Sequence, residues 1–151
     1  MVTVPPAGRE ETIFVLEIYR PILFHSVIRP AATLTMIEAT QHRLSFRFPC
    51  DYINLFLEAN GFEALVGERG MYLLFYDLAT VEEVLDAELE HYDRRLIFIA
   101  SNGSDRGFAY HRDSLSPQIV EISISDFDLG ITREIGSVRQ LFELARENCG
   151  L

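Results

Sequence analysis

The sequence predicts an α+β fold in which a twisted, mainly antiparallel β-sheet is packed by about four helices. Three residue pairs have the spacing of a capping box, in which each side chain bonds a free backbone N–H at a helix start. The three pairs are Thr35 with Glu38, Thr80 with Glu83, and Ser137 with Gln140. Apolar runs of strand length lie between these signals, without the regular βαβ repeat of a parallel sheet.

Residues 1–32 form an N-terminal extension to the main domain, which is expected over residues 33–151. The first residues of the extension contain prolines and a glycine, which predict a loose tail. Residues 12–19, TIFVLEIY, are rich in β-branched and aromatic side chains and predict a strand. This strand would serve as an edge strand or as the contact of a homodimer. Pro21 and Pro30 interrupt the remainder of the extension.

The first helix of the main domain is predicted over residues 35–45. Leu34, Ile37 and Leu44 lie at spacings that give it an incomplete apolar stripe. The bulky residues 46–48 then suit an extended connector.

A second helix is predicted over residues 49–60. Pro49 suits its first position, because the missing N–H of proline costs nothing there. Four apolar residues recur at helical spacing and predict a buried face. They are Tyr52, Ile53, Phe56 and Leu57. Asn60-Gly61 is typical of a left-handed helix stop, so both residues are expected to be structural rather than part of a binding site.

The rest of the chain predicts four strands and two further helices. The strands are expected near residues 71–76, 95–100, 107–111 and 118–124, and the helices near 80–92 and 137–147. The second and third of these strands form a predicted hairpin around the polar turn at 101–104. In each helix, apolar residues at helical spacing give one face directed to the core.

In order and spacing, these segments resemble the SUKH superfamily, the Smi/Knr-type domains, over residues 33–147. The family pattern is roughly I-x-x-x-E-x-x-L-x-x-x-L-P-x-x-Y-x-x-F-L-x-x-x-N-G. The residues that match it are Ile37, Leu44, Phe48-Pro49, Tyr52, Leu55-Phe56 in reversed order, and Asn60-Gly61. Gln41 stands where the family usually has glutamate, and Ser45 where it often has glycine. Residues 96–110 and 138–145 resemble the family's later hairpin and its closing helix.

A length of 151 residues suits a single globular domain, and 48% hydrophobic residues allow a substantial core without disulfides. Cys50 and Cys149 show no paired spacing and are expected to be ordinary thiols. Glu17, Arg20 and Pro21 interrupt the first apolar run, which therefore differs from the core of a signal peptide. With no run of about 18 apolar residues, no membrane-spanning helix is predicted, and a soluble, cytoplasmic protein is expected.

The net charge of -10 is concentrated in one segment. Residues 51–93 carry eleven acids and one arginine, Arg69, so this segment alone has a net charge of -10. Nucleic acids and anionic membranes require a basic surface, and the composition argues against both. It favours a basic protein partner.

No catalytic, cofactor-binding or metal site is predicted. The turn at 102–107 fits neither phosphate-loop pattern, and the segment at 126–130 lacks the acid that a calcium loop needs at its last position. The histidines are scattered, with no H-x-x-x-H pair. The sequence leaves open a pairing of Cys50 with one of them, since catalytic groups meet in space rather than in sequence.

An acidic stripe is the remaining candidate site, and it is predicted to bind a partner. Its residues are Glu82, Asp86, Glu90 and Asp93, at i, i+4, i+8 and i+11 of the helix expected near 80–92, with Glu83 alongside. Such a stripe is normally a solvated face. Here, however, like charges four residues apart cost about 0.2–0.5 kcal/mol per pair, and acids in the last turn oppose the helix dipole. A merely solvated face would more often include Lys or Arg, and the stripe is therefore interpreted as a surface for a basic partner.

Resemblance to bacterial SUKH proteins implies an immunity protein, which binds a toxin domain, often a nuclease, and neutralises it by occlusion. The alternatives are a regulatory scaffold, as in the fungal cell-wall regulators of the superfamily, and an enzyme. The lack of a catalytic motif and the local acidic excess agree with the first. We therefore expect a non-catalytic protein with a basic protein partner, and no cofactor.

Overall fold

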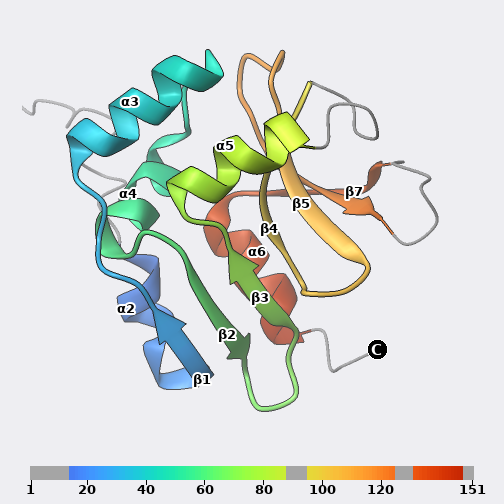
Figure 1. Ribbon diagram of the computed structural model, residues 1–151. Coiled ribbons are helices and arrows are strands. Elements are labelled where there is room, and N and C mark those ends of the chain that lie inside the picture. The colour runs from blue at the N-terminus through green and yellow to red at the C-terminus, as the bar shows by residue number, and fades with distance from the viewer. Residues whose placement is uncertain (1–13, 88–94, 125–130, 148–151) are drawn as a thin grey trace, which may run out of the picture.

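The computed structural model describes residues 14–87, 95–124 and 131–147 and confirms the α+β class (Figure 1). The helices in these ranges are α2 (Val15–Tyr19), α3 (Leu34–Leu44), α4 (Cys50–Glu58), α5 (Leu78–Ala87) and α6 (Val138–Glu147), and a 3-10 turn, η1 (Arg20–Ile22), follows α2. The strands are β1 (Leu23–Ile28), β2 (Phe62–Val66), β3 (Tyr72–Phe75), β4 (Leu96–Ser101), β5 (Arg106–His111), β6 (Ile119–Ser123) and β7 (Ile131–Gly136).

The sheet is a meander in which each strand pairs antiparallel with the next, in the order β1-β2-β3-β4-β5-β6-β7. The helices α3 and α4 lie between β1 and β2 in the chain, and α5 lies between β3 and β4. In Figure 1, α6 lies behind the sheet and α5 crosses in front of β4. All six residues of β4 are buried, because other elements cover both faces of this strand.

Three strands of the sheet, β1, β2 and β7, are absent from the sequence-based prediction, which contains β3 to β6 and a strand over residues 12–19. β1 lies between Pro21 and Pro30, and only its two end residues are partly buried, so its sequence carries no strong alternation. β2 follows directly after the helix stop at Asn60-Gly61, and β7 lies close before α6. Each of the three becomes a strand because a neighbouring strand pairs with it.

The strand predicted over residues 12–19 is wrong for its described part, since residues 15–19 form the helix α2. Val15, Leu16 and Tyr19 are buried, and this spacing directs one helical face into the core. Burial of that face overrides the β-propensity of the segment.

The start of α2 is capped by a residue far away in the sequence. The carboxylate of Glu58, at the end of α4, accepts hydrogen bonds from the backbone N–H groups of Leu16 (3.0 Å) and Glu17 (3.1 Å). These are N–H groups that a helix cannot satisfy internally. Burial raises the pKa of the Glu58 carboxyl, while the two backbone hydrogen bonds act in the opposite direction.

One of the three predicted capping boxes is confirmed. The Ser137 N–H donates to Oε1 of Gln140 (2.8 Å), and the Gln140 N–H donates to Oγ of Ser137 (3.2 Å), so α6 begins as expected. The other two helices start earlier. Thr33 caps α3 by accepting from the Met36 N–H at 3.2 Å, and Asp77 caps the start of α5 by accepting from the Thr80 N–H at 2.8 Å.

A cluster of aromatic rings joins the connector after α3, the helix α4 and strand β5. Its members are Phe46, Phe48, Tyr52, Phe56 and Tyr110, all of them buried. The rings of Phe48 and Tyr52 have centroids 4.8 Å apart, and those of Tyr52 and Tyr110 lie 5.5 Å apart. Each such pair contributes about 0.5–1.5 kcal/mol beyond its buried area. The cluster holds the N-terminal end of α4 against the sheet.

Asn60-Gly61 is structural, although the helix stop is not the left-handed one expected. The helix α4 ends at Glu58, and Ala59 is extended, with φ -158°. The Asn60 side chain instead accepts a hydrogen bond from the Leu78 N–H (2.9 Å) at the start of α5. Gly61 has φ +89°, and a Cβ atom there would lie 2.9 Å from the backbone nitrogen of Asp77.

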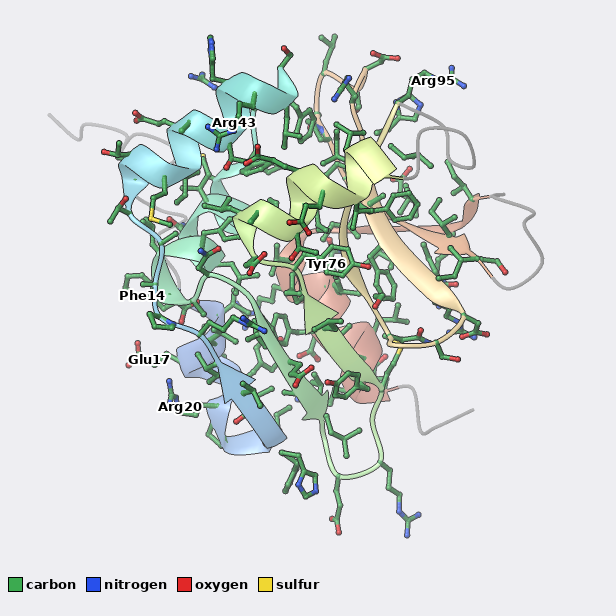
Figure 2. All side chains as sticks on the ribbon, viewed as in Figure 1. Phe14, Glu17, Arg20, Arg43, Tyr76 and Arg95 are labelled. Atoms are coloured by element: carbon green, nitrogen blue, oxygen red, sulfur yellow. The ribbon has the colours of Figure 1, made fainter. Side chains whose placement is uncertain are left out.

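An ion pair joins α3 to α5. Nε of Arg43 lies 2.5 Å from Oε1 of Glu82, and Nη2 of Arg43 donates to Oε2 of Glu82 at 3.0 Å. Arg43 is labelled in Figure 2. The hydroxyl of the buried Thr40 also donates to Oε2 of Glu82, at 2.8 Å. The hydrogen bond from Arg43 lowers the pKa of the Glu82 carboxyl.

The substitution Gly61→Ala is expected to lower the free energy of unfolding by more than about 1 kcal/mol, because backbone strain adds to the clash with Asp77. Gly67→Ala is the matched control, since Gly67 has φ +83° but the nearest atom to its added Cβ lies 3.6 Å away. Urea titrations of both variants give the difference. Equal losses in the free energy of unfolding would show that the close approach of the added Cβ to Asp77 is not destabilising.

The substitution Glu82→Gln is expected to lower the thermal midpoint at neutral pH. A lowered pKa in the folded state contributes stability that is present above the ordinary value of 4.5 and is lost as the pH falls through the folded value. The difference in thermal midpoint between wild type and Glu82→Gln should therefore disappear below about pH 4.5. Glu83→Gln, an exposed neighbour, is the control. A difference that is constant from pH 7 to pH 3 would contradict the role of the ion pair.

Candidate functional site

The predicted acidic stripe lies partly outside the described residues. Glu82, Glu83 and Asp86 belong to α5, whereas Glu90 and Asp93, together with the side chain of Asp86, lie outside the part that the structure describes. Glu83 is exposed. Glu82 is directed to Arg43 and Thr40, so it joins two helices of the same chain. The structure thus gives Glu82 a structural role that its spacing does not reveal.

Several other acids of the segment 51–93 also act within the fold. Asp51, Glu58 and Asp77 accept hydrogen bonds from N–H groups at helix starts, where a carboxylate is favoured by the helix dipole. Glu63 accepts a hydrogen bond from the Tyr72 hydroxyl. Of the acids in this segment whose side chains are described, only Glu68 and Glu83 are exposed. Some acids of this segment therefore stabilise the fold, and others add negative charge to the surface.

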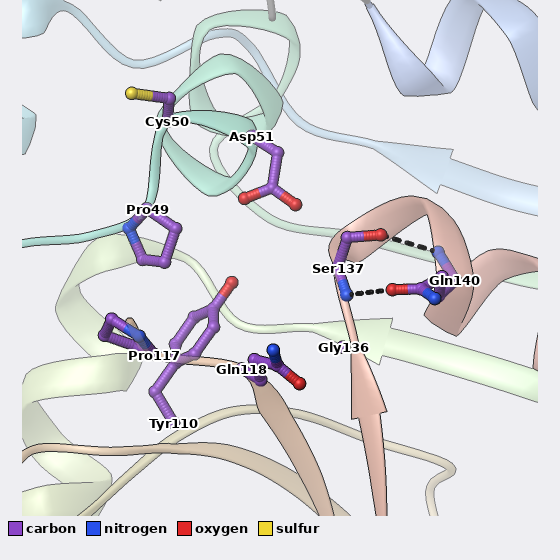
Figure 3. Close-up of a pocket in the computed structure, with 9 residues that line it drawn as sticks. All are labelled: Pro49, Cys50, Asp51, Tyr110, Pro117, Gln118, Gly136, Ser137 and Gln140. Carbon is purple, nitrogen blue, oxygen red and sulfur yellow. Dashed lines mark hydrogen bonds between the residues drawn. The ribbon is translucent and has the colours of Figure 1, made fainter. Parts of the chain in front are cut away.

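A cavity of about 370 Å³ opens between the N-terminal ends of α4 and α6 (Figure 3). Its lining residues come from four separate parts of the chain and are Pro49, Cys50, Asp51, Tyr110, Pro117, Gln118, Gly136, Ser137 and Gln140. The aromatic cluster fixes the α4 side of this cavity, and the Ser137–Gln140 capping box forms the α6 side.

Asp51 links the two helices that border the cavity. Its Oδ1 accepts from the Tyr52 N–H at 2.9 Å, and its Oδ2 accepts from the Val138 N–H at 2.8 Å. One carboxylate therefore lies at the positive ends of two helix dipoles. Each of its oxygens keeps a lone pair for a further hydrogen bond.

Tyr110 contributes a hydroxyl group to the same cavity. The residue is only 1% exposed, and its hydroxyl has no hydrogen-bond partner among the residues that the structure describes. In Figure 3 this hydroxyl is directed into the space between Pro49, Asp51 and Ser137. Burial, followed by the charge of Asp51, raises the pKa of the Tyr110 hydroxyl well above its usual value. The group therefore stays protonated and remains a hydrogen-bond donor.

The rim of the cavity carries two carboxamides and a thiol. Gln140 uses its Oε1 to accept from the Ser137 N–H, which leaves its amide nitrogen at the rim. Gln118 is exposed, and so is Cys50 in the first turn of α4. No histidine is among the nine residues that line the cavity.

The described part of the chain lacks two further kinds of feature. No three of its histidine, cysteine, aspartate and glutamate side chains are grouped so that they could hold a metal ion. None of its helices has both the length and the apolar character needed to cross a membrane.

Sequence reasoning does not find this cavity as a site. It identifies two helix starts, one at Pro49 and one at the Ser137–Gln140 capping box. It assigns no function to Asp51, Tyr110 or Gln118. One signal in the sequence could have pointed to a site: the predicted helix starts at Pro49 and Ser137 each have a polar side chain close by in the sequence. Nothing in their spacing shows that the two starts meet, or that Tyr110 lies between them.

Comparison with known proteins identifies the family. None of the curated proteins matches the chain. The model of the SMI1 / KNR4 family (SUKH-1) matches residues 31–143, which include α3 to β7 and the first part of α6. This range contains the whole cavity lining and α5, while α2 and β1 lie before it. The match covers most of the chain and confirms the resemblance. The chain therefore belongs to the SMI1/KNR4 family (SUKH-1).

Proposed function

We propose that this chain is a non-catalytic protein-binding domain, and specifically an immunity protein that neutralises a toxin domain by occluding it. The observation that carries the proposal is the family match over residues 31–143. Bacterial proteins of the superfamily that the sequence resembles act in this way. The toxin would be encountered in the cytoplasm, and a stable complex would suffice for neutralisation without any chemical step.

The charge of the chain supports a basic partner. Its net charge is -10, and the active-site clefts of nucleases are basic because they bind phosphates. An acidic surface would cover such a cleft and would attract it before contact, which raises the association rate. Glu83 lies exposed on α5, and Asp86, Glu90 and Asp93 follow it in the sequence. We retain these residues as the partner-binding surface of the proposal, with Glu82 as the link that holds α5 to α3.

A second candidate is a regulatory scaffold of the Smi/Knr type, without a toxin partner. The specific observation in its favour is a set of exposed apolar side chains at the N-terminal end of the described chain. They are Phe14, Ile18, Phe24 and Val27, on or next to α2 and β1 (Figure 2 labels Phe14). β1 is an edge strand, so this region could also serve as the contact of a homodimer. Such a surface would bind through apolar contact rather than through charge.

The partner itself distinguishes the two candidates. The full chain is used as bait in lysate of its own cells, and captured proteins are identified by mass spectrometry. We expect a basic protein with a toxic activity that the chain abolishes when the two are present in equal amounts. Toxic activity that persists in the saturated complex would contradict an immunity function. Capture of a partner without toxic activity would favour the scaffold.

The acidic surface is tested by removing three charges without disturbing the ion pair to Arg43. The variant Glu83→Gln/Asp86→Asn/Glu90→Gln should associate with the partner more slowly than wild type, with a weaker dependence on salt, because long-range attraction acts before contact. The dissociation rate should change less. Stopped-flow measurements from low to high salt provide both rates.

A matched control removes the same net charge elsewhere. The variant Glu17→Gln/Glu68→Gln/Glu134→Gln changes exposed acids on α2, on the β2–β3 turn and on β7. If both variants slow association equally, attraction depends on the net charge alone and the surface around Glu83 is not the contact.

A further inference from the structure

We propose that the cavity between the N-terminal ends of α4 and α6 binds a neutral amide group, presented by a protein partner as a peptide bond or as the carboxamide of an asparagine or glutamine. The observation that carries this proposal is the buried hydroxyl of Tyr110, which points into the cavity and has no hydrogen-bond partner among the described residues.

The Tyr110 hydroxyl requires an acceptor. A buried polar group normally has a hydrogen-bond partner, and one left without a partner is destabilising. Its ring is held by packing against Tyr52 and Phe46, so the hydroxyl cannot turn away to solvent. The Tyr52 hydroxyl is also buried without a partner among these residues, but Tyr52 does not line the cavity. Tyr110 therefore offers a fixed donor to whatever enters.

Asp51 offers the complementary acceptor. Its two oxygens already accept from Tyr52 and Val138, and each has one more lone pair available. The negative charge of Asp51 is balanced locally, because the N-terminal ends of α4 and α6 each carry about half a positive elementary charge. A fixed donor and a fixed acceptor thus line one cavity that has little net charge of its own.

This arrangement favours an amide over a charged group. The carbonyl of an amide can accept from Tyr110, while its N–H can donate to Asp51. A guanidinium or ammonium has no acceptor, so the Tyr110 proton would stay unpaired. A carboxylate can accept from Tyr110 but has no proton for Asp51, so two acceptors would face each other without a hydrogen between them. The rim amides of Gln118 and Gln140 add donors for a second carbonyl of a peptide.

The size of the cavity fits this class of ligand. About 370 Å³ is enough for a side chain or a short turn of a peptide, and Pro49 and Pro117 add apolar surface beside the polar groups. The proposal does not depend on a toxin partner or on the charges of α5. If the charge variants do not slow association, the amide-binding proposal still stands. If the cavity binds no amide, the proposal of an acidic binding surface still stands.

The test uses three small molecules of nearly identical shape: acetamide, acetate and acetamidinium. Each is titrated into the full chain labelled with nitrogen-15, and the backbone amide signals of Gly136, Ser137 and Val138 are followed. Acetamide should bind saturably in the millimolar range expected for so small a ligand. Acetate and acetamidinium should each bind about fivefold more weakly, the effect of one lost hydrogen bond. Equal affinities, or stronger binding of either ion, would overturn the proposal.

The role of Tyr110 is tested by Tyr110→Phe, which keeps the buried ring and removes only the hydroxyl. We expect the affinity for acetamide to fall about fivefold, to that of the two ions. Tyr72→Phe is the control, because the Tyr72 hydroxyl bonds Glu63 and does not line the cavity. It should leave acetamide binding unchanged. Acetamide binding that survives Tyr110→Phe unchanged would overturn the proposal.

A second variant keeps the test decisive if Tyr110→Phe fails to fold. Asp51→Asn removes the negative charge and keeps one of the two acceptor oxygens, so that one of the two helix starts still has its hydrogen bond. The preference for acetamide over acetate should then disappear, because the amide N–H of asparagine can donate to acetate. A preference that persists in this variant would show that Asp51 does not select the ligand.

Discussion

The carboxylate of Asp51 is the contact on which the arrangement of the site depends. It accepts one hydrogen bond from its own helix, α4, and one from the first turn of α6, which lies far away in the sequence. A carboxylate at the positive ends of two helices is favoured by both dipoles. The same contact fixes how closely the two helix starts approach each other. The cavity exists because these starts are held side by side above Tyr110.

Carboxylates play the same part throughout this acidic chain. Glu58 caps α2, Asp77 caps α5 and Glu82 joins α5 to α3, so acids from the segment that carries the charge excess support several helix starts and one helix contact. This arrangement separates two uses of negative charge. The acids that accept hydrogen bonds within the fold are partly buried, whereas Glu68 and Glu83 remain exposed to solvent. Only exposed charge contributes fully to the attraction of a distant partner.

Local signals predict what depends on local interactions. Apolar runs locate β3 to β6, and the Ser137–Gln140 box locates the start of α6, because strand and helix periodicity and helix capping involve residues that are near each other in sequence. The boxes at Thr35 and Thr80 are misplaced because Thr33 and Asp77 lie closer to the true helix starts. The strand expected over 12–19 is wrong because Glu58 and the core stabilise a helix there. β-propensity is too weak to resist such contacts.

The sequence by itself determined the α+β class, the family and the concentration of acidic charge, because each of these depends on composition, order and spacing along the chain. The tertiary structure alone decided which acids are used for capping and which remain at the surface. It also decided that Pro49, Tyr110 and Ser137 meet around one cavity. The physical reason is that antiparallel strand pairing and the packing of α4 and α6 bring together residues that no local interaction connects.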